Sequence, residues 1–128
     1  MKHALLVGLG GFVGSIARFR LGGVILHHSN SWRFPLSTFA VNVIGCFAIG
    51  ALAALVEHRD FFSPETRLFL FTGLLGGFTT FSAFGYEGLF LLRRGEIGIA
   101  VAYAGLSVLG GLGAVWLGFR LFSVGTHQ

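Results

Sequence analysis

Residues 68 to 92 read LFLFTGLLGGFTTFSAFGYEGLFLL, an apolar stretch with Gly76-Gly77 and Thr79-Thr80 at its middle. Glycine weakens a helix through backbone entropy, and threonine hydroxyls compete for backbone hydrogen bonds. We therefore expect the helix to break within residues 76–84. If the stretch crosses a membrane, the break falls near the bilayer midplane, where unpaired carbonyls are tolerated only when they face protein, water or an ion. This segment is the best candidate for a functional site.

The composition is that of an integral membrane protein. Of 128 residues, 54% are hydrophobic and 11% are charged, and the mean hydropathy is +0.80. That leaves too little polar material to coat a soluble globule. Four apolar segments, about 4–26, 34–56, 68–92 and 97–122, are each long enough to cross ~30 Å of hydrocarbon. We expect an all-α fold in which residues 1–128 form a single four-span membrane domain.

The joints between these segments carry helix start and stop signals. Pro35 is expected in the first turn of the second span, where its missing N–H costs nothing. Ser63 is expected to cap the helix that leads into the third span, with Pro64 in its first turn. Gly95 follows two arginines and is expected as the C-terminal cap of that span.

Basic residues are almost evenly divided between the two ends of the expected bundle. Four spans place both termini on one side, and the Lys and Arg counts are then four against five: Lys2, Arg59, Arg67 and Arg120 against Arg18, Arg20, Arg33, Arg93 and Arg94. Cytoplasmic loops normally hold an excess of basic residues. The missing bias predicts insertion in both orientations and an antiparallel homodimer about a two-fold axis in the membrane plane. The net charge of +4 indicates anchoring at lipid headgroups and does not point to nucleic acid.

Glycines at four-residue spacing let membrane helices approach closely. The chain has 21 glycines, which include Gly10-x-x-x-Gly14 and Gly73-x-x-x-Gly77. We expect these pairs to serve dimerisation. The alternative is that they only pack the helices of one chain.

Polar side chains within the spans are candidate site residues. Asn42 must find partners or leave two donors unpaired in a dry medium, so it either joins helices or donates to an anion. Phe81 and Phe84 lie three residues apart on one helix face, and the positive edges of their rings can meet an anion. Packing in lipid or core is the default for such rings. Glu87 is the only carboxylate within a span. Further hydroxyls lie on the third and fourth spans: Thr79, Thr80, Ser82, Tyr103 and Ser107.

Three runs of residues resemble, in order, the signatures of the Fluc (CrcB) family of fluoride ion channels. They are Gly10 to Gly14 with Arg18, Thr38 to Asn42 with Gly45, and Gly73 to Phe84. The resemblance extends over essentially the whole chain. It implies a dual-topology homodimer in the cell's inner (plasma) membrane, with two pores for passive export of fluoride. It also implies a central structural sodium ion held by the backbone carbonyls of Gly76 and Thr79 from each subunit.

The resemblance also implies roles for individual side chains. Asn42 would donate hydrogen bonds to fluoride, Phe81 and Phe84 would line its path, and Arg18 would lie near a vestibule. The polar track or its mouth would contain Thr38, Thr80, Ser82, Glu87, Tyr103 and Ser107. The chain departs from the family pattern at Ser37, Cys46 and Ala83, and the last of these lacks a hydroxyl that the track commonly has.

Two other classes of function are compatible with the sequence. A small dual-topology proton-coupled exporter would need a titrating carboxylate within the membrane, and Glu87 is the candidate. A non-transport membrane assembly subunit would use Asn42, Phe81 and Phe84 for packing alone. We expect no enzyme activity, because no span holds a nucleophile with a nearby base.

Overall fold

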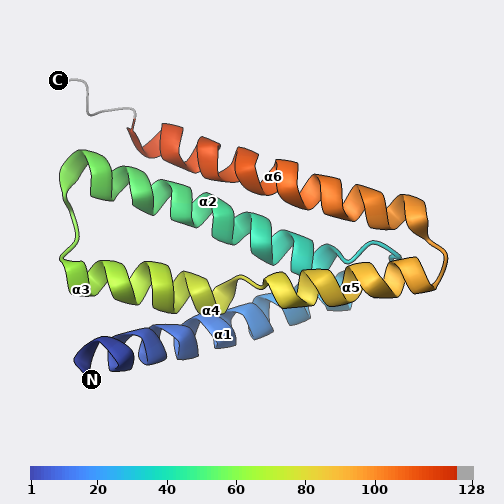
Figure 1. Ribbon diagram of the computed structural model, residues 1–128, viewed down its shortest axis with the longest axis horizontal. Helices are drawn as coiled ribbons and strands as arrows, with labels where there is room; N and C mark the ends of the chain where they lie inside the picture. The colour runs from blue at the N-terminus through green and yellow to red at the C-terminus, as the bar shows by residue number, and fades with distance from the viewer. Residues whose placement is uncertain (124–128) are drawn as a thin grey trace.

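The computed structural model describes residues 1–123, and this part of the chain contains four helical segments arranged side by side (Figure 1). The first two are α1 (Lys2–Ser29) and α2 (Leu36–Arg59). The third begins with α3 (Pro64–Arg67) and a π-helix, η1 (Leu68–Leu75), and continues as α4 (Gly76–Phe78) and α5 (Phe81–Arg93). The fourth is α6 (Ile97–Ser123).

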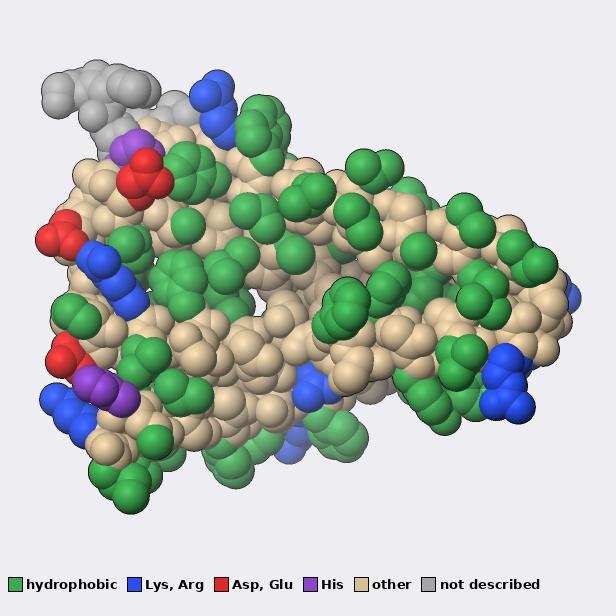
Figure 2. All heavy atoms as spheres, viewed as in Figure 1, with side chains coloured by type: hydrophobic (Ala, Val, Ile, Leu, Met, Phe, Trp, Pro, Cys, Tyr) green, Lys and Arg blue, Asp and Glu red, His purple; other side chains and the backbone are tan. Residues whose placement is uncertain are grey.

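All four segments are long and apolar enough to cross a membrane. Apolar side chains cover most of the visible face, and most charged side chains gather towards its two ends (Figure 2). The first residues of α1 and the last residues of α6 lie at the same end of the molecule (Figure 1). The protein is therefore a multi-pass membrane protein, as its composition predicts.

The helices pack in two pairs. α2 lies along α6, and α1 lies against η1 and α4. In the first pair the backbones touch at glycines, because a Cβ atom at Gly50 would collide with the carbonyl of Val115, and one at Gly118 with the carbonyl of Phe47.

The prediction that the spaced glycines serve dimerisation is wrong, because their faces are occupied within the chain. A Cβ atom at Gly10 would lie 2.6 Å from the carbonyl oxygen of Phe69, and one at Gly77 would lie 2.6 Å from that of Gly11. A Cβ atom at Gly73 would lie 3.0 Å from the Cα atom of Gly10. These glycines hold α1 against the third segment.

The expected helix signals are mostly confirmed. The Ser63 hydroxyl accepts a hydrogen bond from the Thr66 N–H (3.2 Å), with Pro64 in the first turn. Gly95 has φ +76° and follows α5 as its cap. Pro35 was expected inside α2 but lies just before it: its φ of −75° and ψ of 72° form an inverse γ-turn, closed by a 2.8 Å hydrogen bond from the Leu36 N–H to the Phe34 carbonyl.

The third segment breaks within the expected range, but not at the glycines. Gly76 and Gly77 are helical in α4, whereas Thr79 (φ −87°, ψ 157°) and Thr80 (φ −148°, ψ 118°) are extended. α5 restarts at Phe81. The π-helical turns of η1 directly before the break were not predicted.

Candidate functional site at the broken third segment

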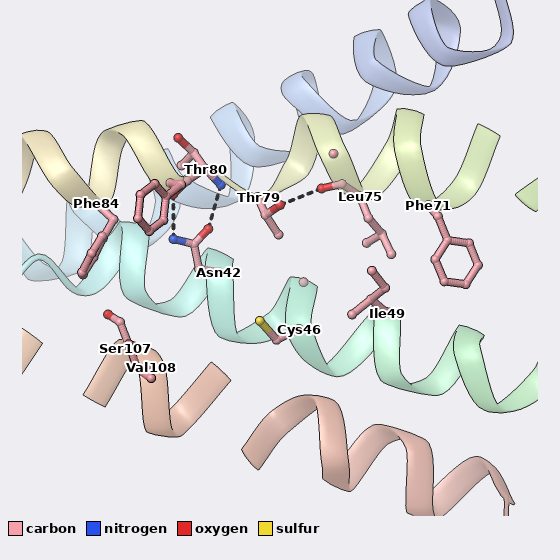
Figure 3. Close-up of a pocket in the computed structure, with 13 residues that line it drawn as sticks. Asn42, Cys46, Ile49, Phe71, Leu75, Thr79, Thr80, Phe84, Ser107 and Val108 are labelled. Atoms are coloured by element: carbon pink, nitrogen blue, oxygen red, sulfur yellow. Dashed lines mark hydrogen bonds between the residues drawn. The ribbon is translucent and has the colours of Figure 1, made fainter. Parts of the chain in front are cut away.

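The backbone at the break is held by the side chain of Asn42, which lies in the second turn of α2 (Figure 3). The Asn42 Nδ2 donates to the Thr80 carbonyl (2.9 Å), and its Oδ1 accepts from the Thr80 N–H (2.8 Å). These two bonds fix the orientation of the amide. Since the amide nitrogen carries two hydrogens, one N–H donor is left for another partner.

Asn42 thereby frees a carbonyl of the broken helix. In a continuous helix the Thr80 N–H would donate to the carbonyl four residues earlier, that of Gly76. Here it donates to Asn42 instead. The same happens one turn later, where the Ala83 N–H donates to the Thr80 hydroxyl (3.2 Å) rather than to the Thr79 carbonyl. The carbonyls of Gly76 and Thr79 have both lost their helical donors.

Of the two carbonyls between these, that of Gly77 has a charged partner. The half-buried Arg18 on α1 donates its Nε–H to this oxygen (3.1 Å). The structure shows that the Arg18 side chain faces the bundle. Its guanidinium satisfies an acceptor that the break would otherwise leave unpaired at mid-membrane depth.

A cavity of about 400 Å³ lies beside the break. Asn42 and Phe84 point towards it from α2 and α5, and Ser107 lies across from them on α6 (Figure 3). The Phe81 and Phe84 rings are 5.6 Å apart between centroids and inclined by 39°. Phe81, whose ring forms part of the cavity wall, is 83% exposed in the single chain. The cavity is therefore open on the side of this ring.

The structure divides the expected polar track into two groups. Glu87 accepts hydrogen bonds on both carboxylate oxygens, from the Thr38 hydroxyl (2.7 Å) and from the fully buried Tyr103 hydroxyl (2.8 Å). Ser107 lies one turn from Tyr103 but lines the cavity at Asn42. Ser82 is exposed, with its hydroxyl 3.4 Å from that of Thr80.

Two further hollows follow, of which the first shares Thr80 with the central cavity and the second shares Thr38 with the first. One, of about 260 Å³, is lined by Arg18 together with Ser37, Thr38 and Thr80. The other, of about 300 Å³, reaches from Thr38 and Glu87 to the end of the bundle. Thr80 also lines the central cavity, so these side chains mark a discontinuous polar route along α5.

The central cavity is also lined by Cys46, which the sequence indicated only as a departure from the family pattern. It follows Asn42 by four residues, so helical spacing could have placed both on one face. Within residues 1–123, no group of three His, Cys, Asp or Glu side chains could hold a metal ion. The oxygens near the break that lack a helical donor are the backbone carbonyls of Gly76 and Thr79.

Comparison with known proteins decides the family. The model of the family described as CrcB-like protein, Camphor Resistance (CrcB), matches residues 5–119. The chain belongs to the CrcB-like family. This confirms the resemblance seen in the three sequence runs.

Relatives of this CrcB-like protein carry a functional name. A protein of Methylobacillus flagellatus is 58% identical over 121 residues, which cover 94% of each chain. One of Acidobacterium capsulatum is 49% identical over 119 residues (92% of this chain, 93% of the relative), and one of Chlorobium phaeobacteroides is 47% identical over 114 residues (89% and 87%). All three are named fluoride-specific ion channel FluC.

Proposed function

We propose that this CrcB-like protein forms a fluoride-selective channel that lets fluoride leave the cell passively. The observation that carries the proposal is the central cavity, where the one unused N–H of Asn42 lies beside the rings of Phe81 and Phe84. Fluoride is small and holds its water tightly, so a pore must replace that water with donors and positive ring edges. The names of the relatives support the same ion.

The second part of the proposal is an antiparallel homodimer with two pores. In one chain Phe81 is 83% exposed and Gly76 is exposed, although both lie at the middle of a span. A second copy, inserted in the opposite direction, would cover these positions and complete the walls of each cavity. The balanced distribution of basic residues is compatible with such insertion in the plasma membrane.

The third part is a structural sodium ion on the two-fold axis. The carbonyls of Gly76 and Thr79 have lost their helical donors to Asn42 and to the Thr80 hydroxyl. Carbonyl oxygens are hard ligands that suit a hard cation, and two antiparallel copies would offer four of them. A bound cation would supply positive charge near the fluoride path. In this account Asn42 has two roles, since it keeps a cation ligand free and donates to the anion.

The remaining polar residues would extend the path on either side of the rings. Thr80 and Ser107 offer hydroxyls at the central cavity, and the Ser82 hydroxyl lies 3.4 Å from that of Thr80. The hollow beside Arg18 would be a vestibule. Thr38, Glu87 and Tyr103 would form the polar group nearer the bundle end, with the acid held by two hydroxyl donors.

The experiment is fluoride release from liposomes, followed with a fluoride electrode and compared with chloride release. The wild type should release fluoride fast and retain chloride. Phe81→Ile should largely abolish release, because an aliphatic side chain has no positive edge. Phe61→Ile is the matched control, since Phe61 is also exposed (64%) but lies in the connection between α2 and α3. Equal chloride release by the wild type would reject the proposed selectivity.

A further inference from the structure

The hollow at the end of the bundle opposite the first residues of α1 has an outer part that the proposed fluoride path does not use. It has a volume of about 300 Å³ and lies between the connection from α1 to α2 and the end of α5. Its inner end is formed by Thr38 and Glu87, and its outer part contains Arg33 and Arg94. Figure 2 shows basic side chains at this end of the molecule.

The two arginines of this hollow are only partly neutralised. Arg33 lies 3.6 Å from Glu96, and its side chain is 76% exposed. Among the described residues, no carboxylate lies within ion-pair distance of Arg94, whose guanidinium lies over the Phe90 ring at 5.7 Å. The hollow therefore offers a planar cation held in place by an aromatic ring and free to bind an anion.

The other walls of the hollow are those of a membrane interface. Trp32 and Tyr86 line it and are 59% and 64% exposed, and such aromatic residues favour the headgroup level of a bilayer. Leu26 and Phe90 also line it, and both are exposed. A ligand bound here would have its charge at the arginines and an apolar part against these side chains.

We propose that this hollow binds the phosphate headgroup of an anionic lipid, with Arg94 as the main ligand and Arg33 as the second. Guanidinium groups bind phosphate through paired N–H donors, and basic pockets between membrane helices bind anionic headgroups. A free anion is a poorer match, because it would leave the exposed apolar side chains of the wall, Leu26 and Phe90, without a partner. This inference does not depend on which ion the protein conducts.

The test uses the tryptophan that lines the hollow. The chain has two tryptophans, so Trp116→Phe leaves Trp32 as the only one. The protein is placed in phosphatidylcholine vesicles that contain either dibrominated phosphatidylglycerol or dibrominated phosphatidylcholine, because bromine quenches tryptophan fluorescence on contact. The ratio of quenching measures the preference of the site for the anionic lipid.

We expect the wild-type hollow to prefer phosphatidylglycerol, and Arg94→Gln to lower that preference about fivefold. Arg33→Gln should lower it less, because Glu96 already offsets part of its charge. Arg93→Gln is the matched control: this neighbouring arginine does not line the hollow and should leave the preference within about twofold. Unchanged quenching by brominated phosphatidylcholine shows that each variant is inserted.

Three results would overturn the proposal. The first is equal quenching of the wild type by both lipids, and the second is an equal loss in Arg93→Gln and Arg94→Gln. The third separates a lipid phosphate from a free one: inorganic phosphate is added to the vesicles and compared with chloride at equal ionic strength. If phosphate alone removes the preference, the hollow binds the free ion. The same small effect from both salts supports the lipid.

Discussion

Replacing Asn42 by leucine tests the break and the anion path together. Leucine has the same branched shape but neither accepts from the Thr80 N–H nor donates to the Thr80 carbonyl, so two hydrogen bonds of 2.8 and 2.9 Å are lost. Each contributes about 0.5–1.5 kcal/mol net, so the variant should be destabilised by about 1–3 kcal/mol. Part of this loss is recovered if the Thr80 N–H turns to the Gly76 carbonyl, and that turn would take away a proposed sodium ligand.

The effect of Asn42→Leu on transport should exceed its effect on stability. It removes the only side-chain amide that lines the cavity. A hydrogen bond to a charged group contributes about 1.5–3 kcal/mol, which corresponds to about a 10- to 150-fold loss of fluoride flux. Flux is measured by fluoride release from liposomes, and stability by thermal unfolding in detergent with and without sodium.

Asn42→Asp separates the two roles of this residue. Its carboxylate can still accept from the Thr80 N–H, so the Gly76 carbonyl stays free and stabilisation by sodium should persist. It has no N–H for the anion and adds a negative charge, so fluoride flux should fall at least as far as in Asn42→Leu. Wild-type flux and unfolding temperature in both variants would refute the reasoning.

Three further predictions concern packing and the half-buried acid Glu87. Gly14→Ala should lower the unfolding temperature, because the new Cβ atom would collide with the Leu74 carbonyl at a cost of about 1–3 kcal/mol. Gly8→Ala is the control and should be neutral, since a Cβ atom there has nothing within 4 Å. Equal unfolding temperatures of the two variants would contradict the packing of α1. Tyr103→Phe should destabilise the protein by about 1–3 kcal/mol in the same assay, because one Glu87 oxygen loses its donor; an unchanged unfolding temperature would argue against this bond. Glu87→Gln should retain most fluoride flux without a proton gradient, and flux that disappears and depends on such a gradient would favour the exporter.

The four spans could be predicted from sequence because each apolar segment is long enough to cross a bilayer by itself. The site of the break could be placed only within residues 76–84. The glycine pair seemed the weakest point of the helix, but Gly76 and Gly77 remain helical. The helix ends at the threonines because Asn42, from another span, binds Thr80. No local signal around residue 80 reveals a partner 38 positions away.

The site itself shows the same limit. Spacing puts Tyr103 and Ser107 on one face of α6, but it does not say that Glu87 engages one hydroxyl and leaves the other at the cavity. Likewise, the glycine spacing indicates close helix packing without naming the partner, which turned out to be a helix of the same chain. Side-chain chemistry identified the polar residues, and tertiary contacts decided how they are grouped.

The most direct test of the central claim, that the protein conducts fluoride selectively, is the reversal potential across a planar bilayer. With a tenfold fluoride gradient and equal chloride on both sides, the current through the wild type should reverse at about 59 mV, the equilibrium potential of a monovalent ion at a tenfold gradient. A current that reverses at zero under these conditions, or follows a chloride gradient, would contradict the account.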